Sequence, residues 1–72
     1  MIKWNSLQDN HVEGKSGNTK FYIRLKKERG KLVTESLYIV PKEGTKRKIM
    51  SQEHGATTVE EMKLIAELEW NY

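Results

Sequence analysis

Two alternating stretches on either side of Gly30 constrain the fold of this chain most. Phe21, Ile23 and Leu25 recur at every second position before Gly30, and Val33, Leu37 and Ile39 occupy odd-numbered positions of the stretch after it. This period is typical of strands with one buried face. Because both apolar sets must share a face, the connecting loop needs an odd number of residues. The pattern predicts an antiparallel hairpin with a three-residue loop and a bulge at Gly30.

Weaker signals surround this hairpin. Residues 1–7 alternate loosely and predict a short first strand, and residues 11–13 could extend an edge. Residues 14–18 are rich in turn-forming types and predict a loop. Pro41 cannot donate to a ladder and ends the return strand. Residues 46–51 predict a last strand at a charged sheet edge, and the sequence leaves open whether it joins the sheet.

The C-terminal segment predicts a helix over about residues 58–70, after a loop at residues 52–56. Thr57 or Thr58 can cap its start, because a glutamate follows three residues after each and can complete a capping box. Its sheet-covering face consists of Val59, Met62, Ile65 and Ala66.

These elements predict a single α+β domain over residues 1–72. The strand region, residues 1–51, forms a three- to four-stranded antiparallel sheet, which the single C-terminal helix covers on one face.

Composition excludes several kinds of chemistry. The 72 residues include no cysteine, so thiolate zinc sites, thiol nucleophiles and disulfides are excluded. His11 and His54 are isolated in loop-like sequence, and we expect neither a metal nor a cofactor. No apolar run could span a bilayer and the start lacks a signal-peptide pattern, which predicts a cytoplasmic protein without a membrane partner. A non-enzymatic binding protein is therefore expected.

Charge is unevenly distributed. Residues 15–48 carry an excess of eight positive charges, whereas residues 59–72 carry an excess of three negative ones. On the hairpin face away from the helix, two tyrosines would stand among cations and hydroxyl residues, Thr34 and Ser36. Such a surface can stack bases and bind phosphates, and the nucleic-acid-binding candidates are Tyr22, Arg24, Lys26, Arg29, Lys31 and Tyr38. The basic run at residues 42–48 is more typical of a solvated turn than of a phosphate site.

A second apolar stripe on the helix indicates another surface. Leu64 and Leu68 lie opposite the sheet-covering face, with Trp70 and Tyr72 following. Exposed leucines beside aromatic and acidic residues suit a protein partner or a homodimer contact. Alternatively, the N-terminal strand folds over them through Trp4 or Leu7.

The chain resembles small sheet-plus-helix proteins encoded by phages and prophages. The resemblance lies in Trp4, a glycine-containing loop, the strand at residues 21–25, the return strand, and the segments 58–63 and 66–67. Some proteins of this kind inhibit host enzymes. One, an inhibitor of RNA polymerase, has an Ala-Glu-Trp-like helix segment similar to residues 66–70 here.

A rival resemblance is to the arm-type DNA-binding domain of phage integrases, which also has a basic hairpin followed by a helix. That layout corresponds to about residues 20–69.

The resulting expectation is a small phage-like binding protein that docks on a host macromolecule, as an inhibitor or accessory factor. Its partner would be a host protein or nucleic acid. Two alternatives are a nucleic-acid-binding module that uses the basic aromatic hairpin face, and a structural homodimer.

Overall fold

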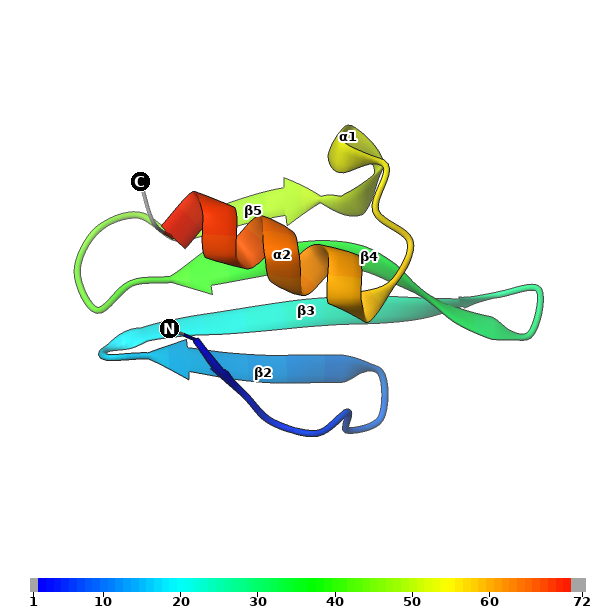
Figure 1. Ribbon diagram of the computed structural model, residues 1–72, viewed down its shortest axis with the longest axis horizontal. Coiled ribbons are helices and arrows are strands. Elements are labelled where there is room, and N and C mark those ends of the chain that lie inside the picture. Colours follow the sequence, from blue (N-terminus) through cyan, green and yellow to red (C-terminus); the bar gives the residue numbers. More distant parts are fainter. Residues whose placement is uncertain (1, 71–72) are drawn as a thin grey trace.

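The computed structural model describes residues 2–70 and shows a five-stranded antiparallel sheet with a helix across one face (Figure 1). Spatial order follows chain order, and the strands are β1 (Lys3–Trp4), β2 (His11–Ser16), β3 (Thr19–Glu28), β4 (Lys31–Val40) and β5 (Arg47–Met50). The helices are α1 (Ser51–His54) and α2 (Val59–Trp70). The α+β class and the C-terminal helix are confirmed, but the expected three to four strands are too few. The segment at residues 46–51 does join the sheet, through β5, and the loop expected at residues 52–56 begins with the single turn of α1.

The largest departure from the expected strands is β2, which occupies part of the segment predicted as a loop. Gly14 is buried within β2 and pairs with Trp4 of β1. A Cβ atom at Gly14 would lie 2.5 Å from Cε3 of Trp4 and 2.9 Å from Cγ2 of Ile2. Glycine is therefore required here because the Trp4 ring crosses the strand, not because the chain turns. The turn itself is limited to Gly17 and Asn18, between paired Ser16 and Thr19.

The hairpin of β3 and β4 is confirmed, but its extra residue is not in the turn. Glu28 pairs with Lys31, which leaves a two-residue turn at Arg29 and Gly30, both with positive φ (54° and 78°). These angles match a type I′ turn. The odd residue required by the apolar pattern is instead Glu35, a bulge in β4 opposite the Arg24–Leu25 step.

This bulge reverses the side on which the start of β4 presents its side chains. Thr34, expected on the face away from the helix, is buried on the helix side. Its hydroxyl donates to the Ala56 carbonyl (3.1 Å), its N–H donates to the Thr57 carbonyl (3.4 Å), and its carbonyl accepts from Ser51 Oγ (2.8 Å). The bulge thereby connects the sheet to the segment between α1 and α2.

The core lies between α2 and the sheet. Phe21, Ile23, Leu37 and Met62 are fully buried at its centre, and Ala66 lets the helix approach closely. Trp70 closes the end of α2: its ring meets that of Phe21 edge-on at 5.7 Å, and its Nε1 donates to Ser16 Oγ (3.1 Å). The helix is thus held by a buried stripe and by an aromatic contact at its last turn.

A capping box begins α2, as predicted. The Glu61 N–H donates to Thr58 Oγ1 (3.2 Å), and Glu61 Oε1 accepts from the Thr58 N–H (3.2 Å) and the Thr57 N–H (3.2 Å). These hydrogen bonds favour the ionised carboxylate, and the Thr57 N–H is the largest cause of the lowered pKa of Glu61. The sequence left the choice between Thr57 and Thr58 open, and the reciprocal bonds identify Thr58 as the cap.

Thr58→Ala is expected to lower the free energy of unfolding by about 1 kcal/mol, because the cap hydroxyl is lost. Urea denaturation followed by circular dichroism measures it. Acid should weaken the same capping box, because the pKa of Glu61 is depressed from 4.5 in the folded state. The stability that the ionised Glu61 carboxylate contributes is therefore fully present above pH 4.5 and is lost as pH falls through the folded pKa. Thr45→Ala, in an exposed turn, is the matched control; equal losses in both variants would contradict the capping role.

Candidate nucleic-acid interface

The sheet face opposite α2, called the outer face below, gathers aromatic and cationic side chains from four strands. Cross-strand pairing places on it His11, Glu13, Lys15, Lys20, Tyr22, Arg24, Lys26, Tyr38 and Lys48. Most are exposed, whereas Tyr22 and Tyr38 are half-buried. The alternation that buries Phe21 and Ile23 under the helix turns their neighbours outward, so the outer face follows directly from the core pattern.

Tyr22 and Tyr38 pair directly across β3 and β4. The Nζ atoms of Lys46 and Lys48 lie 4.8 and 5.5 Å from the centre of the Tyr38 ring. These are cation–π distances. Lys48 is also the main cause of the lowered pKa of the Tyr38 phenol. The two tyrosines therefore stand at paired positions on the outer face, an aromatic surface with cations at its β5 side.

A shallow hollow of about 360 Å³ lies over this aromatic surface. It is lined by Asn10, His11, Glu13, Tyr22, Arg24, Tyr38, Val40 and Lys46. A volume of this size is at the low end of small-molecule sites. Because two tyrosines line it together with Arg24 and Lys46, the hollow suits a planar group attached to an anionic chain.

Of the six residues predicted to bind nucleic acid, the structure brings four together. Tyr22, Arg24 and Tyr38 line the hollow. Lys26 is the next residue of β3 after Arg24 on the same face, and its Nζ lies 3.7 Å from Glu28 Oε2. The other two predicted residues, Arg29 and Lys31, lie at the tip of the hairpin. That tip begins about 20 Å along the strand from Tyr22, so Arg29 and Lys31 contribute only to the long-range field.

Sequence reasoning missed residues on both sides of the tyrosines. His11 and Glu13 were missed because β2 was expected to be short, and its full length depends on pairing with β1 and β3 that residues 11–13 alone could not establish. Lys46 and Lys48 were assigned to a solvated turn. Their place beside Tyr38 depends on β5 pairing with β4, which residues 46–51 alone could not establish.

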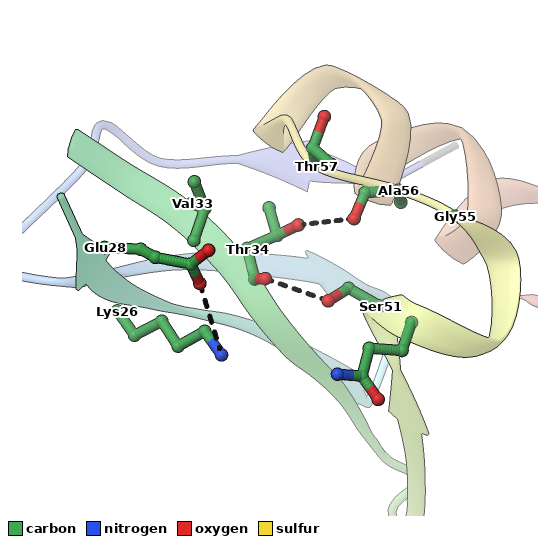
Figure 2. Close-up of a pocket in the computed structure, with 9 residues that line it drawn as sticks. Lys26, Glu28, Val33, Thr34, Ser51, Gly55, Ala56 and Thr57 are labelled. Carbon is green, nitrogen blue, oxygen red and sulfur yellow. Dashed lines mark hydrogen bonds and ion pairs between the residues drawn. The ribbon is translucent and has the colours of Figure 1, made fainter.

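A second hollow, of about 250 Å³, lies where the end of the β3–β4 hairpin meets the segment after α1 (Figure 2). Figure 2 shows the Thr34 hydroxyl directed at the Ala56 carbonyl and the Ser51 hydroxyl at the Thr34 carbonyl. Lys26 and Glu28 face one another at its other side. Since these polar groups satisfy one another, the hollow has a structural explanation and is not a candidate site.

The exposed side of α2 is the second predicted surface. Leu64 and Leu68 are 65% and 61% exposed, so the N-terminal strand does not cover them. Trp4 instead packs against Phe21 and Lys63, and Leu7 is itself half-exposed. Trp70 packs its ring against Phe21 yet stays 36% exposed at the end of α2, and Tyr72 lies outside the described residues. The exposed surface, called the α2 ridge below, consists of Glu60, Glu61, Leu64 and Leu68, with the half-buried Glu67 between the two turns.

Within residues 2–70, no group of three or more His, Asp or Glu side chains is placed to hold a metal ion. Neither helix in this part of the chain is long and apolar enough to cross a membrane. No protein-family model matches the chain, and no curated protein sequence or solved structure is significantly similar to it.

Proposed function

We propose that this chain is a non-enzymatic binding protein whose outer face binds single-stranded nucleic acid. The observation that supports it best is the pairing of Tyr22 and Tyr38 on an open sheet face with Lys46 and Lys48 beside one ring. Aromatic rings on a sheet provide stacking platforms for unpaired bases, and lysines beside them neutralise the connecting phosphates.

The shape of the surface favours a single strand over a duplex. The helix α2 lies on the opposite face, so it cannot enter a major groove from the same side as the tyrosines (Figure 1). Stacking on Tyr22 and Tyr38 requires bases whose flat faces are free, as they are in a single strand. Arg24, Lys20 and Lys26 extend along β3 on the outer face and can follow a flexible backbone.

Fluorescence anisotropy of a labelled single-stranded 12-mer, titrated at several salt concentrations, tests this proposal. With four to five phosphates neutralised, the log–log slope of the association constant against salt should be about −3. A duplex of the same sequence is the control and should bind at least ten-fold more weakly. Absence of saturable binding at low salt would contradict the proposal.

The α2 ridge supports a second candidate function, docking on a host protein. Leu64 and Leu68 form an apolar strip between acidic side chains on a helix whose other side is already buried. Charge complementarity calls for a partner with basic residues around an apolar groove. A symmetric homodimer through α2 would bring like charges of Glu60, Glu61 and Glu67 together, which disfavours that arrangement.

Leu64→Asp and Leu68→Asp are expected to leave the domain folded, because both side chains are more than half exposed. Sedimentation and circular dichroism of each variant measure assembly and folding. We expect the parent and both variants to be monomeric, and both variants to unfold at the midpoint of the parent. Unfolding of either variant would show that the α2 ridge belongs to the core, and a parent dimer dissociated by the substitutions would show a homodimer contact.

A further inference from the structure

Charge and hydrogen-bonding character change systematically across the outer face, along one row of paired residues. From β2 to β5 the row reads Glu13, Tyr22, Tyr38 and Lys48. One end is an acceptor-only carboxylate, the middle is aromatic, and the other end is cationic. A nucleotide stacked on this row therefore meets different chemistry at its base edge and at its phosphate.

The phosphate side of the row is the β5 side. Lys46 and Lys48 both lie within 6 Å of the Tyr38 ring centre, so a base stacked there has cations beside it. At the β2 side, the Glu13 carboxylate would repel a phosphate. Its Oε1 lies 3.5 Å from His11 Nε2, and about half of the side chain remains exposed at the edge of the hollow. A base edge directed toward Glu13 would therefore leave the phosphate of that nucleotide beside Lys46 and Lys48, with Lys20, Arg24 and Lys26 along β3 for neighbouring phosphates.

A carboxylate at that position discriminates among bases. The carboxylate of Glu13 can only accept hydrogen bonds, and the Asn10 side chain, which lines the same hollow, can donate. Cytosine presents an amino donor next to a ring-nitrogen acceptor, a pattern that these two groups complement. Thymine and uracil present a carbonyl oxygen where cytosine has its amino group, so the carboxylate would face an acceptor.

Resting on the proposed single-strand binding, we infer that Glu13 makes the hollow a base-edge site, one that prefers bases with an exocyclic amino group to thymine and uracil. Cytosine and thymine give the sharpest comparison, because both are pyrimidines of similar stacking area.

Competition between unlabelled dC and dT 10-mers for a labelled strand tests the preference. The parent protein should bind the dC 10-mer about five- to ten-fold more tightly. In Glu13→Gln this ratio should fall to about one, because a carboxamide can also donate to a carbonyl oxygen. Glu28→Gln is the matched control. It removes a carboxylate charge at another position, where Glu28 pairs with Lys26, and should keep the parent ratio of dC to dT affinity.

The possible outcomes test the base preference and the single-strand binding separately. Equal affinity of the parent for the two 10-mers, with binding still lost on substitution of the tyrosines, overturns the base preference and leaves single-strand binding intact. A parent preference that Glu13→Gln preserves also overturns the role of Glu13. Absence of binding to either 10-mer overturns both.

Discussion

Gly14→Val is expected to destabilise the domain by about 3 kcal/mol, near the upper end of overpacking costs, because two ring carbons of Trp4 lie within 2.6 Å of the Cβ position. Trp4 cannot swing aside freely, since its ring also lies against Phe21 (centroids 6.0 Å apart). For a chain of this length the total free energy of unfolding is about 4–10 kcal/mol, so the loss is a large fraction of it. Urea unfolding monitored by tryptophan fluorescence measures the effect, because Trp4 and Trp70 both contact Phe21.

Two further variants separate steric overlap from a general cost of altering β2. Lys15→Val places the same side chain at the next, exposed position and should change the free energy of unfolding by less than about 0.5 kcal/mol. In a Trp4→Ala background the penalty of Gly14→Val should shrink, since the overlapping ring is absent. A penalty of full size in that background would mean that the overlap with Trp4 is not its cause.

The elements that sequence predicted best are those whose signals are local. The alternation through Phe21, Ile23 and Leu25 fixes the face of β3, and the Thr58–Glu61 pair fixes the start of α2. Both depend on residues close together in the chain, where pattern and hydrogen bonding need no knowledge of the rest of the fold.

The elements it missed depend on contacts between distant residues. Gly14 looks like a turn residue until Trp4 is placed over it, and Thr34 looks outward-facing until Glu35 bulges. The parity of the apolar pattern did require one extra residue between the strands. It could not say where, because a three-residue loop at Gly30 and a two-residue turn combined with a bulge at Glu35 both keep Leu37 and Ile39 on the face of Phe21 and Ile23.

The same distinction applies to the candidate sites. Tyr22, Arg24 and Tyr38 were identified because they alternate with core residues of a well-signalled hairpin. The acidic side of the hollow, at Glu13, was not predicted, because it required β2 to run the full length of its pairing with β3. From the sequence, Leu64 and Leu68 could be either exposed or covered by the N-terminal strand, and only the path of β1 decided between the two.

Replacing Tyr22 and Tyr38 together with alanine should weaken binding of a single-stranded 12-mer about a hundred-fold, with about ten-fold from each ring. Loss of one aromatic–base stack costs about 1–3 kcal/mol, and about 1.4 kcal/mol corresponds to a factor of ten. The rings are half-buried on the face away from the core, so the variants should remain folded. Anisotropy titration at fixed salt, with circular dichroism of each variant, measures both effects.

Tyrosine-to-phenylalanine variants decide whether stacking or the phenol is responsible. Tyr22→Phe and Tyr38→Phe keep the rings and should bind within about two-fold of the parent, because every base presents a π face to either ring. The salt slope should also stay near the parent value in the double-alanine variant, since Lys46, Lys48 and Arg24 remain. If affinity were unchanged in the folded double-alanine variant, any binding would be purely electrostatic and the aromatic surface would have no part in it.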